Sequence, residues 1–169
     1  LGLSAIERGV AWSVHLEQAF GSWDTHTDNP VQNTQNEDLF DALVVLGDEL
    51  AARPGEHGGS MLDETVVAVV SEMGRTPHTP KVTDSCGRDH HVNGYSIFMA
   101  GGGFKGGTAF GETDEFGNSV VSQPLDIHDI HATLLHQMGM NHEKLTFRHG
   151  GRDHRLTDVS GKVISELLA

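Results

Sequence analysis

The chain has 169 residues, which suits one domain with a single core, and its one cysteine excludes an internal disulfide framework and a cysteine-rich zinc site. Its formal charge is −13, from 24 acidic residues against 11 lysines and arginines, which argues against nucleic acid as a general partner. No apolar run is long enough to cross a bilayer, so no membrane span is predicted. The 12 histidines are unusual, because histidine is the commonest metal ligand and the usual acid or base near neutral pH.

The first part of the chain predicts two helices and a strand. A capping-box spacing predicts a short helix over residues 4–9, which ends at a glycine. Apolar and polar residues alternate over residues 10–16, as in a half-buried strand, and a loop follows at residues 21–30. A second capping box begins an amphipathic helix over residues 34–53, which a Pro-Gly pair stops.

The rest of the chain predicts strands that alternate with helices. The β-branched run 65–70 is typical of a central strand buried on both faces, and residues 95–100 predict another buried strand. Residues 109–121 predict a hairpin, Asp126 can cap a helix that ends before Gly139, and a last helix is expected from Asp158 to Leu167. This alternation predicts an α/β fold, with a layered and mostly parallel sheet flanked by helices.

Three polar segments beside the predicted strands carry candidate ligands. The candidates are Asp24 and His26 in WDTHTDN, Glu72 and Arg75 in SEMGRTP, and Arg88, Asp89 and His90 in GRDHH. In open α/β sheets, ligands bind at the carboxyl ends of the strands, so these segments are expected to converge there. Their carboxylates and imidazoles suit a divalent metal.

Each candidate also has a simpler interpretation. A carboxylate at Glu72, directly after an apolar strand, would need a cation, an arginine or hydrogen bonds to offset its desolvation. A salt bridge from Glu72 to Arg75 or Arg88 would meet that need as well as a metal does. Asp24 and His26 alone also fit an aspartate turn and a surface imidazole. Convergence of the three segments would favour the metal site.

Two further signals favour structural roles. The run GGGFKGG has no Ser or Thr after its lysine, so a turn is favoured over a nucleotide-binding loop. His128 and His131 have metal-ligand spacing on a helix, with Asp129 between them. They are expected near the capped and exposed start of that helix, and a structural role is favoured over metal binding.

The order of several strings resembles one known family. The strings, in chain order, are WDTHTDN, MLDETVV, SEMGRTP, GRDHH, FMAGGGFKGG, GETDEFG, DIHDIHATLLHQMG and GRDHRLTDVSG. They resemble the domain-of-unknown-function 1501 family, a large bacterial family that is described as sulfatase-like and placed in the alkaline phosphatase superfamily. The resemblance covers nearly the whole chain. It implies that residues 1–169 are the C-terminal part of one alkaline-phosphatase-like α/β hydrolase domain.

The resemblance also implies a two-metal site that activates a nucleophile and stabilises phosphoryl or sulfuryl transfer. Zinc is the expected metal, and calcium, magnesium or manganese occur in relatives. The aspartate and histidine of WDTHTDN match the superfamily's pair for one metal. Glu72 stands where relatives carry an aspartate and Met73 where they carry a histidine, so Asp89 and His90 are candidates for the missing donors.

The function implied is a metal-dependent hydrolase of phosphate or sulfate esters, with a small-molecule or glycan ester as substrate. Arg75 and Arg88 would hold the charged oxygens of the ester, because a guanidinium offers paired donors. The superfamily's nucleophile is expected upstream of Leu1, so the upstream part of the same protein is expected to be needed. Export signals in the family favour a periplasmic or secreted location.

Two alternatives remain at this point. One is a non-catalytic carbohydrate- or surface-binding module that keeps the fold with a degraded metal site. The other is an acidic cluster that holds a structural calcium ion without any reaction.

Overall fold

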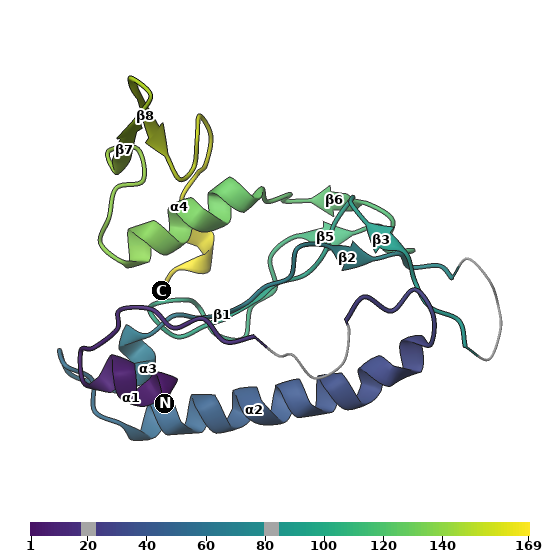
Figure 1. Cartoon of the computed structure of the whole chain (residues 1–169), viewed down its shortest axis with the longest axis horizontal. Coiled ribbons are helices and arrows are strands. Elements are labelled where there is room, and N and C mark those ends of the chain that lie inside the picture. Colours follow the sequence, from purple (N-terminus) through teal and green to yellow (C-terminus); the bar gives the residue numbers. More distant parts are fainter. Residues whose placement is uncertain (18–22, 80–84) are drawn as a thin grey trace. The chain divides into compact units, whose positions relative to one another are not determined.

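A computed structural model describes residues 1–17, 23–79 and 85–169, and the chain divides into two compact units (Figure 1). Unit 1 comprises Leu1–Thr65 and Glu72–Tyr95, and unit 2 comprises Val66–Ser71 and Ser96–Ala169. Each unit combines helices with short antiparallel strand pairs. All of the candidate ligands lie in unit 1.

Unit 1 contains both helices predicted for the first part of the chain. The helix α1 spans Gly2–Glu7 and α2 spans Gln32–Ala52. Neither capping box forms, because α1 begins two residues before Ser4 and α2 continues directly from a 3-10 turn, Asn29–Val31. A proline in that turn fixes a backbone angle that suits the start of a helix, which explains the earlier start of α2.

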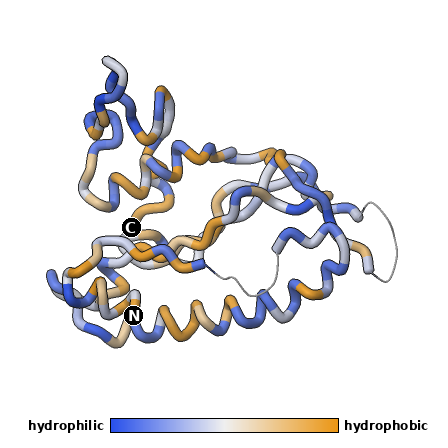
Figure 2. Tube along the Cα trace, in the orientation of Figure 1, coloured by the Kyte–Doolittle hydropathy of each residue, from blue (hydrophilic) through white to orange (hydrophobic). Residues whose placement is uncertain are grey.

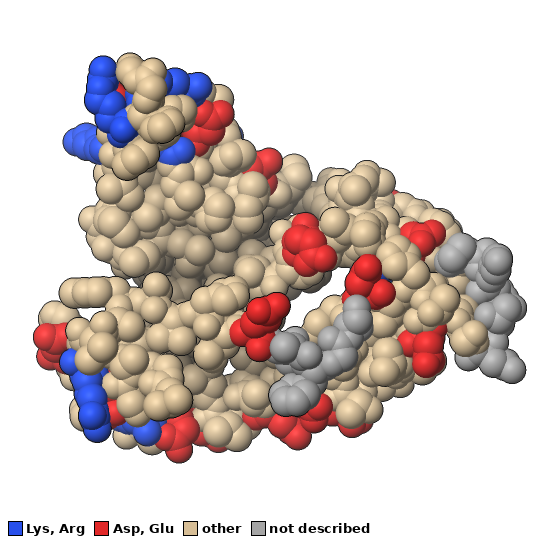
Figure 3. All heavy atoms as spheres, viewed as in Figure 1, with Lys and Arg blue, Asp and Glu red and all other residues tan. Residues whose placement is uncertain are grey.

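The long helix α2 packs against the short helix α3, Met61–Glu64. Leu50 of α2 is 1% exposed and Met61 is also buried, so this contact forms the apolar core of unit 1. Hydrophobic and hydrophilic residues alternate along α2 (Figure 2), and acidic side chains lie along it (Figure 3). The helix ends as predicted, because Arg53 adopts the extended conformation that a following proline favours.

The predicted strand over residues 10–16 does not form. These residues pair with no strand in the described ranges, and Trp12 is 95% exposed. Alternation alone is a weak signal, since a strand needs a partner for its backbone hydrogen bonds. Unit 1 instead pairs β2, Gly74–Arg75, with β3, His90–His91, in a short antiparallel sheet.

Unit 2 contains three antiparallel strand pairs among its described residues. They are β1 (Val67–Val69) with β4 (Phe98–Ala100), β5 (Glu112–Thr113) with β6 (Val120–Ser122), and β7 (Thr146–His149) with β8 (Arg152–Arg155). The predicted hairpin over residues 109–121 is confirmed by β5 and β6. The β7–β8 hairpin was not predicted, and lysines and arginines gather where it lies (Figure 3).

The helix α4, Ile127–Gln137, holds the apolar core of unit 2 with Ile130, Leu135 and Ile164 buried. Asp126 caps α4 and Gly139 follows its end with a φ of 73°, both as predicted. The helix expected from Asp158 is wrong. Asp158 has a φ of 46°, outside the helical range, and only a 3-10 turn, η2 (Ser165–Leu167), forms further on.

The predicted fold class, an α/β layer with a mostly parallel sheet flanked by helices, is therefore wrong. Every sheet in the described ranges has two strands, and every pair is antiparallel, so the architecture is α+β. β1 was expected at the centre of a sheet, yet it pairs with β4 only and the neighbouring Val70 is 59% exposed. Among the helices of the described residues, none has the length and apolarity needed to cross a membrane.

Candidate metal centre

Three segments of unit 1 meet around the candidate ligands, and among the described residues an antiparallel strand pair and backbone hydrogen bonds, not a parallel sheet, bring them together. The segments are 23–29, 74–76 and 85–91. In the β2–β3 pair, Arg75 lies opposite His90. The first and third segments are joined by backbone hydrogen bonds from Asp28 to Ser85, from Asn29 to Cys86 and from Arg88 to Thr25, each 2.9 to 3.0 Å long.

The close approach of two of these segments depends on Gly87. A Cβ atom at this position would lie 2.2 Å from the carbonyl carbon of His26 and 2.4 Å from the carbonyl oxygen of Thr25. Both atoms belong to the backbone and have no freedom to rotate away. Gly87 therefore sets the spacing of the site without contributing a ligand, and sequence reasoning missed it.

Polar contacts from the start of α2 fix the loop that carries Asp24 and His26. The side-chain amide of Gln32 donates to Thr25 Oγ1 at 2.7 Å and to the Trp23 carbonyl at 2.9 Å. Thr25, which is 6% exposed, donates in turn to Asn29 Oδ1 at 3.2 Å. The buried hydroxyl is thus satisfied on both sides, and the residues beside it are held in place.

Asp24, His26 and His90 form the centre of the cluster. Asp24 Oδ1 lies 3.0 Å from His26 Nε2 and 2.9 Å from His90 Nε2. The two imidazole rings lie 4.8 Å apart at their centroids. On its other side, His26 places Nδ1 at 3.0 Å from Asp89 Oδ1. The side chains of Asp24, His26 and His90 are 55%, 46% and 44% exposed, so the cluster is open to solvent.

Arg75 adds a positive charge to the cluster through an ion pair with Asp24. Its guanidinium donates to Asp24 Oδ1 and, at 3.1 Å, to the backbone carbonyl of Arg88. Hydrogen bonds from Arg75 and then from His90 lower the pKa of Asp24 from its ordinary value of 3.8 to about 2. Asp24 is therefore a carboxylate throughout the neutral range, which is the form that binds a cation.

Arg88 and Glu72 contribute differently from what the sequence indicated. The contacts of Arg88 that shape the site come from its backbone, whose N–H donates to Thr25 and whose carbonyl accepts from Arg75. Glu72 is exposed and lies outside the group of ligand atoms formed by Asp24, His26 and His90. The expected cost of desolvating Glu72 therefore does not arise.

A family model for proteins of unknown function, DUF1501, matches residues 2–168. The chain belongs to the DUF1501 family. No curated protein and no solved structure matches it. The resemblance to DUF1501 inferred from the order of the motifs is thus confirmed, and the match covers all three segments of the site.

The ligand atoms of this DUF1501 chain fit a single divalent cation. The atoms offered by Asp24, His26 and His90 all lie within 4.8 Å of one another. Tetrahedral zinc with ligands at about 2.0 to 2.2 Å separates them by roughly 3.3 Å, so the present contacts of 2.9 and 3.0 Å from Asp24 to the two imidazoles would have to open slightly. Two imidazoles with one carboxylate favour zinc over calcium, which prefers oxygen ligands.

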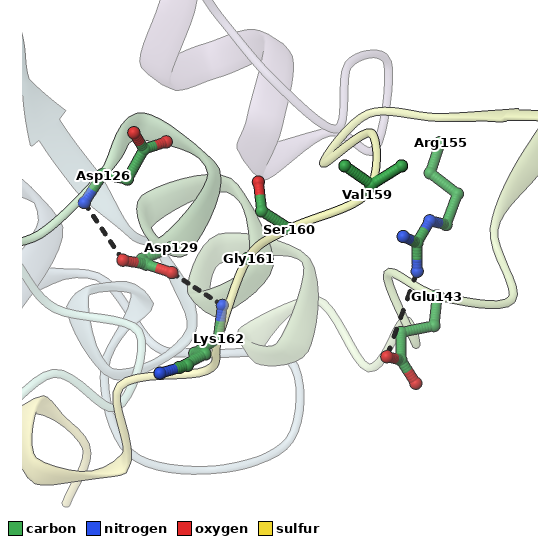
Figure 4. A pocket seen from close by; sticks show the side chains of 8 residues that line it. All are labelled: Asp126, Asp129, Glu143, Arg155, Val159, Ser160, Gly161 and Lys162. Atoms are coloured by element: carbon green, nitrogen blue, oxygen red, sulfur yellow. Dashed lines mark hydrogen bonds and ion pairs between the residues drawn. The ribbon is translucent and has the colours of Figure 1, made fainter.

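A second group of aspartates and histidines, in unit 2, supports helix α4. Asp129 accepts from the Asp126 backbone at 3.0 Å and from the Lys162 backbone at 2.8 Å (Figure 4). Asp126 accepts from the His128 backbone at 2.9 Å. Asp126, Asp129 and Lys162 border an open hollow of about 450 Å³, which Glu143 and Arg155 also line. The carboxylates of Asp126 and Asp129 cap helix α4, so the structural role inferred for this segment fits the contacts.

Proposed function

We propose that this protein is a metal-dependent hydrolase of phosphate or sulfate esters, in which Asp24, His26 and His90 hold a divalent cation, with zinc the preferred metal. The observation that carries the proposal is the convergence of these three ligands. Asp24 and His90 are 66 residues apart in the chain, so local turn geometry does not explain their contact. A bound cation would polarise an ester oxygen and lower the pKa of a bound water molecule.

The side chains around the cluster suit an anionic ester. Asp24 supplies the negative charge that attracts a cation, and Arg75 keeps it ionised. The guanidinium of Arg75 is also a permanent positive charge beside the cluster, which would offset the charge of a phosphate or sulfate group. Arg88 has the same proposed role through its side chain. Because the ligands are about half exposed, a substrate as bulky as a glycan ester can reach them.

The motif order supports the class of reaction, because it resembles sulfatase-like proteins of a superfamily that uses metals in phosphoryl and sulfuryl transfer. A periplasmic or secreted location belongs to the same proposal. Fractionation of the native host would test the location separately from the chemistry.

The proposal is tested with the intact protein. Metal content is measured first, and then turnover on a panel of aryl phosphates and aryl sulfates. We expect a stoichiometric divalent metal, turnover of at least one ester, and loss of that turnover in Asp24→Ala. Asp41→Ala is the matched control, because it removes a carboxylate from an exposed position of α2. It is expected to keep wild-type activity.

Three other outcomes would contradict the proposal. Full activity in a metal-free preparation would exclude a metal-dependent reaction. Saturable glycan binding without turnover of any ester would favour a non-catalytic binding module. A bound cation with only oxygen ligands, and with His26 and His90 turned away, would indicate a structural calcium ion.

A further inference from the structure

His26 lies between two carboxylates from different segments. Its Nε2 is 3.0 Å from Asp24 Oδ1, and its Nδ1 is 3.0 Å from Asp89 Oδ1. The two ring nitrogens point away from each other, so the imidazole separates the two carboxylates. An atom bound at Nε2 would lie on the side of the ring opposite to Asp89.

We propose that Asp89 is a positioning residue, which acts through His26 and is not a ligand of the cation. This inference rests on the proposed cation site. A carboxylate that accepts from Nδ1–H fixes the proton on that nitrogen and leaves the lone pair of Nε2 for a cation. It also fixes the rotation of the ring, and it makes Nε2 more basic and so a stronger ligand for a metal ion. The sequence motif GRDHH had indicated Asp89 and His90 as equivalent ligands.

The backbone of Asp89 is held in a way that suits this role. Its N–H donates to Thr76 Oγ1 at 3.1 Å, and its carbonyl accepts from the Thr76 N–H at 2.9 Å. The adjacent β2–β3 pair begins with Arg75 opposite His90. The Asp89 carboxylate is therefore presented from a fixed backbone, whereas the group of three mutually close ligand atoms is made by Asp24, His26 and His90.

The assignment divides neighbouring residues by function. His90 would bind the cation directly through Nε2, which lies 2.9 Å from Asp24 Oδ1, and the adjacent Asp89, whose Oδ1 lies 3.0 Å from His26 Nδ1, would orient His26. Removal of such an orienting carboxylate typically weakens metal binding by about 10- to 100-fold and leaves the set of ligands intact.

The test is a zinc titration of the full chain against a competing chelator, with Co²⁺ spectroscopy of the same variants. We expect Asp89→Ala to weaken zinc binding by about 10- to 100-fold and to keep the cobalt spectrum of the wild type. Asp89→Asn keeps an acceptor oxygen, so its loss should be smaller. His26→Ala and Asp24→Ala each remove a ligand, and both the affinity and the cobalt spectrum should change.

Nitrogen NMR of the zinc-loaded protein gives an independent readout. We expect a proton on Nδ1 of His26 in the wild type and in Asp89→Asn, with the metal on Nε2. If Asp89→Ala fails to fold, the comparison of Asp89→Asn with the wild type carries the test, because it combines a small loss of affinity with an unchanged cobalt spectrum.

Two results would overturn the role of Asp89 while the cation site stands. One is zinc binding by folded Asp89→Ala as tight as that of the wild type. The other is a cobalt spectrum in Asp89→Ala that changes as it does in the ligand variants, which would make Asp89 a ligand. Absence of zinc binding by the wild type would instead remove the proposed cation site, and the role of Asp89 with it.

Discussion

Two groups of aspartates and histidines in the described part of the chain look alike in sequence but have different contacts. In unit 2, Asp126 and Asp129 accept hydrogen bonds mainly from backbone N–H groups, two of which lie two or three residues away. In unit 1, Asp24 faces the side chains of Arg75 and His90, which are 51 and 66 residues away. The first arrangement caps a helix. The second brings together side chains from distant segments, and it is not part of a helix cap or a turn.

The kind of partner, more than the residue types, distinguishes the two groups: the aspartates of unit 2 accept mainly from backbone N–H groups, including that of Lys162, whereas Asp24 contacts side chains. Carboxylates at a helix start satisfy N–H groups that would otherwise lack partners. Carboxylates and imidazoles that converge from distant segments must be held there by other residues. In unit 1 Gly87 allows the close approach of two segments, and the hydrogen bond from Gln32 to Thr25 holds one of them in place.

The largest effect is expected from Gly87→Ala, which disturbs the close approach of segments 23–29 and 85–91 without removing a candidate ligand. The added methyl group would meet backbone atoms of Thr25 and His26, so the segments must separate. We expect a loss of about 3 kcal/mol in the free energy of unfolding, together with loss of zinc binding. Chemical denaturation and a zinc titration measure the two effects.

Gly47→Ala is the matched control for that substitution. Gly47 lies inside α2 with open space around it, so alanine should stabilise the protein by about 0.5 to 1 kcal/mol and leave zinc binding unchanged. Wild-type zinc affinity in Gly87→Ala would show that the close approach is not needed for the site.

A smaller effect is expected from Gln32→Ala. This change removes the hydrogen bonds to Thr25 and to the Trp23 carbonyl, and it leaves the Thr25 hydroxyl with one partner fewer. We expect a loss of about 1 kcal/mol in stability and a weakening of zinc binding by less than about tenfold. Asn33→Ala, at an exposed neighbouring position, should change neither quantity.

Asp126→Ala tests whether the aspartates of unit 2 have a structural role only. Loss of the cap should lower the melting temperature by a few degrees, because the first turn of α4 loses its acceptor. Zinc affinity should stay at the wild-type value. A matching loss of zinc binding would mean that the aspartates of unit 2 contribute to metal binding, and the distinction between the two groups would fail.

The smallest effect is a dependence on acid pH. Because the pKa of Asp24 is lowered from 3.8 to about 2, its contribution to stability is fully present above about pH 3.8 and is lost as the pH falls through 2. The difference in melting temperature between the wild type and Asp24→Asn should therefore shrink as the pH falls from 3.8 to 2. A constant difference down to pH 2 would contradict the pairing of Asp24 with Arg75 and His90.

Among the features that depend on neighbouring residues, some helix limits could be predicted from the sequence, whereas the strand over residues 10–16 and the helix from Asp158 were predicted wrongly. The limits of α4 follow from Asp126 and Gly139, and the end of α2 follows from Pro54. The β7–β8 hairpin also had a local signal that was missed, because Gly150 and Gly151 adopt positive φ angles between its strands.

Features that depend on distant partners could not be predicted in the same way. The run at residues 65–70 fits any half-buried pleated surface, so its composition does not reveal that it has a single antiparallel partner. The candidate ligands were named from their polar segments, because carboxylates and imidazoles are recognisable as residue types. The role of Gly87 depends on a backbone from another segment, and no local pattern indicates it.

The proposed zinc site is tested most directly by anomalous diffraction at the zinc edge from crystals of the full chain loaded with zinc. We predict one peak bonded to Asp24, His26 and His90, with Asp89 hydrogen-bonded to His26 on the far side of the ring. A zinc ion held by other residues, or no peak while the three side chains keep their ion pairs with one another and with Arg75, would contradict the account.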